Sequence, residues 1–82
     1  MKTIVWSPQA RADIRAIDQA TAMQILKTIH RYAASGLGEI KKLQPPRADL
    51  RLRAGEWRVF FRQIEPHTIE ITGVEHRREA YR

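Results

Sequence analysis

The chain has 82 residues, a formal net charge of +6 and no cysteine. This length predicts one domain near the small end of what folds alone, and the absence of cysteine excludes disulfides and thiolate metal sites. No apolar run approaches the ~20 residues that a membrane span needs, and the apolar start stops at Ser7-Pro8, too early for a signal peptide. We therefore expect a single cytoplasmic domain over residues 1–82 with no membrane association.

The first part of the chain predicts a strand and then two helices. Residues 2–6 are β-branched and aromatic, which favours a strand. Ser7 and Asp18 are suitable N-caps for two helices, and Gly36 can end the second in the left-handed conformation. Apolar residues recur at helical spacing, which predicts a hairpin with one buried face. The residues of that face are Ala10, Ile14, Ile17, Ala22, Ile25, Leu26, Ile29, Tyr32 and Ala33.

The second part of the chain predicts a connector and three strands. Pro45-Pro46 lies in the connector, residues 37–48, because proline forbids a helix interior and disfavours a central strand. Beyond it the pattern alternates, with strands expected over residues 50–54, 57–64 and 68–74 and turns at residues 55–56 and 65–67. The expected order is β-α-α-β-β-β, an α+β fold in which a helical hairpin packs on one face of an antiparallel β-meander. The N-terminal strand is expected to join the same sheet.

Basic residues are concentrated in the middle of the chain. Residues 41–62 contain seven basic side chains against Asp49 and Glu56, whereas residues 1–40 are nearly balanced. Such a distribution indicates a polyanion partner at one face. A basic surface that only maintains solubility is an alternative reading of the charge.

Several short motifs, in this order, resemble the RelE/ParE superfamily of toxins from type II toxin–antitoxin systems, and the resemblance covers nearly the whole chain. These motifs are Ser7-Pro8-Gln9-Ala10 after the first strand, Leu43, Leu50-Arg51-Leu52-Arg53, Gly55-Glu56-Trp57-Arg58-Val59-Phe60-Phe61 and His76-Arg77-Arg78-Glu79-Ala80-Tyr81. The closing motif is similar to that of the RelE-like branch.

The resemblance implies an activity and its partners. RelE-like toxins cleave mRNA in the ribosomal A site without a metal, whereas ParE-like toxins inhibit DNA gyrase and lack the residues that cut RNA. The expected function is therefore a metal-independent mRNA endonuclease that inhibits translation and needs no cofactor. A gyrase inhibitor, or a non-catalytic member that only binds its antitoxin, is the alternative. The implied partners are a cognate antitoxin, mRNA on the ribosome, and operator DNA through the antitoxin complex only.

The resemblance also implies which residues form the site. It assigns RNA binding to Arg51 and Arg53, and catalysis to Arg58, Arg77 and Tyr81. The chain departs from the family in two ways. Many relatives have lysine at the first two positions, and the segment after Tyr81 is very short here.

Metal-free RNA cleavage needs a base for the 2′-hydroxyl proton and positive groups around the phosphorane. Guanidinium groups of Arg51, Arg53 and Arg58 would share a sheet face and serve the second need, unless they form only a solvated surface. Tyr81 would be the base, because nearby arginines stabilise a phenolate, although an apolar lid is its alternative role. His76 is the competing proton acceptor.

The remaining aromatic and histidine residues have simpler readings. Trp6, Trp57 and Phe61 are expected in the core, whereas Phe60 shares the face of Arg58 and could line the RNA groove. His30 and His67 have no acidic residue at metal-binding spacing, so no metal site is expected.

Overall fold

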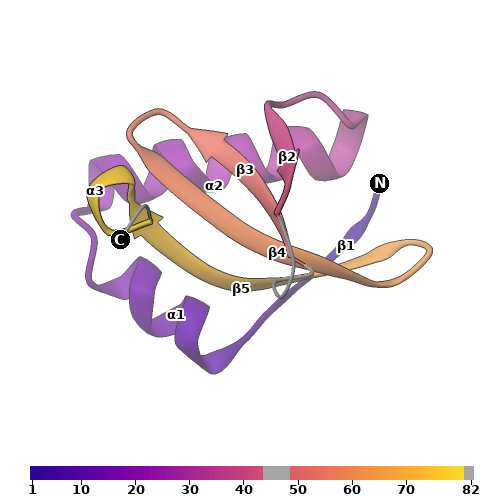
Figure 1. Cartoon of the computed structure of the whole chain (residues 1–82), viewed down its shortest axis with the longest axis horizontal. Helices are drawn as coiled ribbons and strands as arrows, with labels where there is room; N and C mark the ends of the chain where they lie inside the picture. Colours follow the sequence, from indigo (N-terminus) through magenta and orange to yellow (C-terminus); the bar gives the residue numbers. More distant parts are fainter. Residues whose placement is uncertain (44–48, 81–82) are drawn as a thin grey trace.

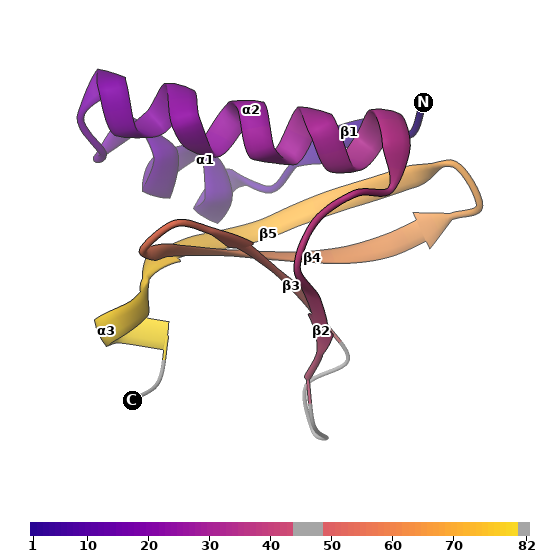
Figure 2. The same cartoon turned by 90° about the horizontal axis from the view of Figure 1, so that it is seen from above.

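The computed structural model of the chain describes residues 1–43 and 49–80. Two helices cover one face of a five-stranded sheet, and a short third helix lies at its other side (Figures 1 and 2). The elements in chain order are β1 (Thr3–Trp6), α1 (Pro8–Arg15), α2 (Gln19–Ser35), β2 (Ile40–Lys42), β3 (Leu50–Ala54), β4 (Trp57–Glu65), β5 (Thr68–His76) and α3 (Arg77–Ala80).

The sheet has the strand order β1-β5-β4-β3-β2. Strands β3, β4 and β5 form the expected antiparallel meander, and β1 joins the sheet by parallel pairing with β5. Gly55 has φ 62° in the turn between β3 and β4, a left-handed value that glycine adopts without strain. The predicted α+β architecture is therefore confirmed.

The expected caps define both long helices. The side chain of Ser7 accepts a hydrogen bond from the backbone N–H of Ala10, and Pro8 stands at the first helical position, where no donor is needed. Asp18 accepts from the backbone N–H of Thr21, and this bond lowers the pKa of its carboxyl group. Gly36 ends α2 with φ 76°.

The core lies between α1, α2 and the sheet (Figure 2). Ile25 and Ile29 of α2 and Phe61 of β4 are each only 1% exposed. Trp57, Ile14 and Trp6 are half-buried and pack against this cluster. Leu26, expected in the same face, is instead 37% exposed, because it lies about 100° around the helix from Ile25 and beside β1.

Two elements were not expected from the sequence. Strand β2 lies inside the predicted connector and pairs with β3, so the connector prediction was wrong for its first part. Only one of its three residues is apolar, and the two lysines are typical of a short edge strand, whose alternation is too brief to detect. Helix α3 is a single turn after β5. Residues 44–48, which include the Pro45-Pro46 pair, lie outside the described residues.

In the described part of the chain, no helix has the length and apolar character to cross a membrane.

Truncating the buried face of α2 should destabilise the fold. We expect Ile25→Ala or Ile29→Ala to lower the free energy of unfolding by ~2–5 kcal/mol, because each leaves a cavity in a packed core. Urea denaturation followed by circular dichroism measures this loss. Met23→Ala is the control on the same helix, since Met23 is 48% exposed and its truncation should change the free energy little. Equal effects in all three variants would contradict the layered packing.

Candidate functional site

Figure 2 shows α1 and α2 on one face of the sheet, and the register of β3 and β4 places the arginines on the opposite face. Leu52 and Val59 face each other across β3 and β4 and are buried under the helices. Because side chains alternate along a strand, the neighbouring residues point to the other face. The register brings Arg53 opposite Arg58, and Arg51 opposite Phe60, on that face. We call it the arginine face, defined by Arg51, Arg53 and Arg58.

Arg58 is held in place by the turn that precedes it. Its side chain is buried, at 8% exposure, and Nη1 donates to the carbonyl oxygens of Gly55 at 3.0 Å and Trp57 at 3.1 Å. Both acceptors are neutral, so these bonds orient the guanidinium without cancelling its charge. A positive group fixed in advance is the kind that stabilises developing negative charge most effectively.

Arg53 and Arg51 differ in exposure. Arg53 is exposed, with Nε 3.4 Å from the Gly55 carbonyl oxygen and Nη1 3.4 Å from the carboxylate of Glu39. An exposed ion pair of this kind contributes little to stability, so a phosphate could replace Glu39 at small cost. Arg51 is half-buried and lies opposite Lys41 of β2, which adds a further cation to its row.

A carboxylate that the sequence reasoning missed lies in the same row as Arg53 and Arg58. Glu75 of β5 is paired with Arg58, so the row across the three strands reads Arg53, Arg58, Glu75. Residues directly opposite each other in an antiparallel pair have Cβ atoms roughly 4.5–5.5 Å apart. Glu75 is therefore the cross-strand neighbour of Arg58 on this face.

A β-bulge explains why Glu75 was missed. The register of β4 and β5 shifts between Phe60, paired with Gly73, and Phe61, paired with Ile71. The extra residue reverses the alternation, so Val74 returns to the core side and Glu75 points to the arginine face. The spacing of Ile69, Ile71 and Val74, interrupted by a glycine, was the signal for it in the sequence.

The bulge also moves His76 away from the arginines. His76 pairs with Trp57, which packs against the core, and the two rings meet edge to face with centroids 5.2 Å apart. Its Nδ1 accepts a hydrogen bond from the backbone N–H of Arg78. The structure therefore does not bring His76 together with the three arginines. His76 would reach the arginine face only if side chains alternated along β5 without the bulge.

Arg77 ties the start of α3 to the turn between β3 and β4. Its backbone N–H donates to the carbonyl oxygen of Glu56 at 2.8 Å, and its guanidinium lies 3.1 Å from the Glu56 carboxylate. Both side chains are more than half exposed. The structure thus places Arg77 beside the turn that precedes β4, outside the row of Arg53, Arg58 and Glu75 and already paired with an acid.

Phe60 and Tyr81 are the two remaining residues that the sequence predicted for the site. Phe60 lies on the arginine face, as the alternation predicts, but it is only 3% exposed and is not part of the core cluster beneath the helices. A nucleotide base of RNA could stack on the Phe60 ring only if the atoms that cover this ring moved. Tyr81 lies outside the described residues.

Residues of α1 and its cap stabilise the bulge from the helix side. The carboxylate of Asp13 accepts a hydrogen bond of 2.9 Å from the backbone N–H of Val74 and another from Gln9. Ser7 donates its backbone N–H to the carbonyl oxygen of Ile71. These contacts bind β5 on the side away from β4, on both sides of the bulge, and they satisfy backbone groups of β5 near the end of β1.

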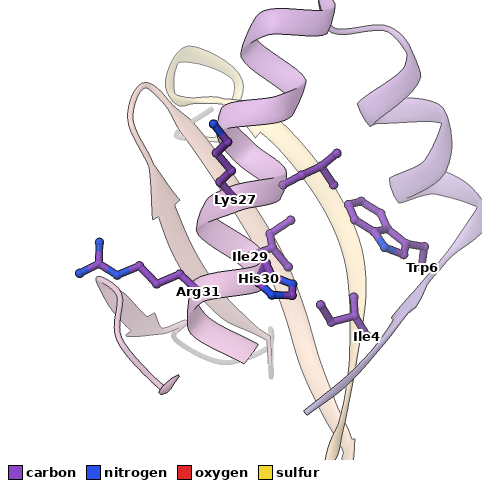
Figure 3. A pocket seen from close by; sticks show the side chains of 7 residues that line it. Ile4, Trp6, Lys27, Ile29, His30 and Arg31 are labelled. Atoms are coloured by element: carbon purple, nitrogen blue, oxygen red, sulfur yellow. The ribbon is translucent and has the colours of Figure 1, made fainter. Parts of the chain in front are cut away.

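A second surface feature lies on the helix side of the molecule. A groove of about 420 Å³ separates β1 from α2, with Trp6 and Ile4 facing Ile29 and His30 (Figure 3). Leu26 completes its apolar floor, and Lys27 and Arg31 also line it, with the Arg31 side chain extending away from Trp6 and Ile4 (Figure 3). The groove is apolar with a basic border, and it is separated from the arginine face by the sheet.

Comparison of the sequence with models of known protein families gives a match over nearly the whole chain. The model of a family described as the ParE toxin of the type II toxin–antitoxin system parDE matches residues 4–81. No curated protein matches the chain at a significant level.

Several solved structures with the same fold come from toxin–antitoxin complexes. The RelBE2 toxin–antitoxin complex from Mycobacterium tuberculosis matches with a TM-score of 0.80 and 22% identity, over 92% of this chain and 96% of that chain. The RelB–RelE antitoxin–toxin complex from Methanococcus jannaschii matches with a TM-score of 0.72 and 20% identity, over 94% of each chain. The YoeB–YefM complex from Staphylococcus aureus has a TM-score of 0.72 at 19% identity, over 93% of this chain and 97% of that chain.

Proposed function

The chain belongs to the ParE toxin family of type II toxin–antitoxin systems, within the RelE/ParE superfamily, and we propose that it cleaves mRNA on the ribosome as a metal-independent endoribonuclease. The observation that carries this proposal is the arginine face. It combines one buried, oriented guanidinium, that of Arg58, with two further arginines on the neighbouring strand. Its site of action would be the cytoplasm, where ribosomes translate.

The geometry suits the charge that develops when the RNA backbone is cut. Attack of a 2′-oxygen on the adjacent phosphorus produces a phosphorane with additional negative charge. Arg58 is oriented before substrate arrives and so pays no reorganisation cost at that step. Arg51 and Arg53 can bind the flanking phosphates, because guanidinium forks match phosphate oxygens.

Inhibition of DNA gyrase is the second candidate function. The family model that matches the chain is named for the ParE toxin of parDE, and ParE-like members of the superfamily act on gyrase. The pairing of Arg53 with Glu39 and of Arg77 with Glu56 also favours it, since both arginines are partly neutralised.

The partner that would control the toxin is an antitoxin with an acidic, amphipathic helix. The groove between β1 and α2 has the shape and composition for the apolar face of such a helix, and Lys27 and Arg31 would attract its acidic residues. A further segment would cover the arginine face or displace the C-terminal segment that carries Tyr81. Contact with operator DNA would come through this complex only.

The first prediction separates the two functions. Induced without its antitoxin, the protein should stop translation and leave truncated mRNA with 2′,3′-cyclic phosphate or 3′-phosphate ends. Sequencing of cleaved transcripts detects these ends. Intact transcripts together with accumulating DNA breaks would instead establish gyrase as the target.

A second prediction divides the roles of the arginines. Arg51→Ala and Arg53→Ala should weaken ribosome binding and reduce its salt dependence, because each removes a phosphate contact. Arg58→Ala should chiefly slow single-turnover cleavage, by ~10²–10³-fold, as the loss of a preorganised donor does. Arg77→Ala should also slow cleavage rather than weaken binding.

Arg62→Ala is the matched control for these variants, because Arg62 points to the same face but is already bonded to Glu70 at 2.7 Å. Thermal unfolding should accompany each assay, since Arg58 is buried, and Arg58→Lys keeps the charge if Arg58→Ala does not fold. A loss in Arg62→Ala as large as that in Arg53→Ala would indicate a general charge effect and contradict the division of roles.

A third prediction concerns the antitoxin. Leu26→Glu introduces a charge into the groove and should weaken antitoxin binding at least ~10-fold, as the loss of a buried anchor does. Met23→Glu is the control, because Met23 is an exposed apolar residue of the same helix outside the groove. Isothermal titration calorimetry measures both affinities. Equal affinities of the two variants would place the antitoxin elsewhere.

A further inference from the structure

Glu75 differs from every other acidic residue of this chain. The sequence has nine aspartate and glutamate residues, and all nine lie in the described ranges. Within these ranges the side chain of Glu75 has no hydrogen bond or ion pair. The eight others each have a partner: Asp13, Asp18, Glu39, Asp49, Glu56, Glu65, Glu70 and Glu79.

Glu75 is also half-buried, and its cross-strand partner is the fixed Arg58. Glu75 lies directly across from Arg58, whose Nη1 is directed at the carbonyl oxygens of Gly55 and Trp57. The Arg58 guanidinium is turned toward these carbonyl groups and makes no salt bridge with the oxygen atoms of Glu75. A half-buried acceptor that the fold leaves without a hydrogen bond is suited to receive a proton from a ligand.

We propose that Glu75 is the general base of the RNA cleavage reaction, an assignment that rests on the function proposed above. The carboxylate of Glu75 takes the proton of the 2′-hydroxyl, and the 2′-oxygen forms a bond to phosphorus. The bond from phosphorus to the 5′-oxygen then breaks, and the 5′-oxygen leaves with the electron pair and takes a proton from water. The products are a 2′,3′-cyclic phosphate and a 5′-hydroxyl, and Glu75 returns its proton to solvent.

The positions of the alternative bases support this choice. His76 lies on the core side of β5, against Trp57, so the imidazole is directed away from the arginine face. A glutamate, with an ordinary pKa of ~4.3, is ionised at neutral pH, whereas a phenol with an ordinary pKa of ~10 is almost entirely protonated. The arginine row thus combines a group that accepts a proton with a group that stabilises the phosphorane.

The test replaces Glu75 by glutamine, which keeps the size of the side chain and removes its basicity. We expect Glu75→Gln to reduce the single-turnover rate of cleavage of ribosome-bound mRNA by ~10²–10⁴-fold. Ribosome affinity should be unchanged or higher, because a negative charge beside a phosphate has been removed. In the wild type the logarithm of the rate should rise with pH along an acidic limb, and this limb should vanish in Glu75→Gln. A residue with a purely structural role would not change the pH dependence.

Two controls isolate the effect. Glu70→Gln changes a carboxylate of the same strand and face that is bonded to Arg62, and it should retain the wild-type pH profile. Glu75→Asp keeps a base and should recover part of the lost rate. Thermal unfolding of each variant verifies that the fold is intact.

The outcomes separate this assignment from the proposed function. A Glu75→Gln rate within about twofold of the wild type, or a Tyr81→Phe variant that alone loses the acidic limb, overturns the role of Glu75 while mRNA cleavage stands. A wild-type protein that cleaves no mRNA and instead causes DNA breaks overturns both.

Discussion

The antiparallel register of β3, β4 and β5 is the constraint on which the rest of the molecule depends. It places Leu52, Val59 and Val74 in one row beneath the helices, and the next row, with Arg53 and Arg58, on the opposite face. A slip by one residue would exchange the two faces and put charged side chains into the core. Burial of the apolar row therefore fixes the position of the charged row, and the stability of the core and the geometry of the candidate site have a common origin.

The bulge in β5 is the point at which helix packing determines the chemistry of the other face. The carboxylate of Asp13 in α1 accepts a hydrogen bond from the backbone N–H of Val74, two residues after the extra residue Thr72. Without that residue, the alternation set by Ile71 would continue, and Glu75 would point into the core while His76 joined the arginines. A carboxylate on the helix side thus stabilises the backbone irregularity that decides which titratable group lies beside Arg58.

Much of the fold could be predicted from the sequence because its signals are local. Capping by Ser7 and Asp18, the glycine after α2 and the alternation of β3 and β4 each depend on a few adjacent residues. The same alternation predicted correctly that Arg51, Arg53 and Arg58 share a face. The end of β5 could not be predicted in this way, because a bulge depends on tertiary contacts that simple periodicity does not contain. The edge strand β2, with its two lysines, was missed because three residues are too few to show the alternation of apolar and polar side chains that predicts a strand.

The charges of the arginine face differ between neighbouring rows, which would suit one row to phosphate binding and the other to the chemical step. The row of Arg53, Arg58 and Glu75 contains an acid and so attracts phosphate less than its arginines alone would. The adjacent row pairs Arg51 with Lys41 and holds no acidic residue on β2 or β3 at that level. Under the proposed function, the affinity for RNA phosphates and its dependence on salt would come mainly from this second row. The first row can then include a carboxylate, because a base contributes to the rate of the chemical step and not to the strength of phosphate binding.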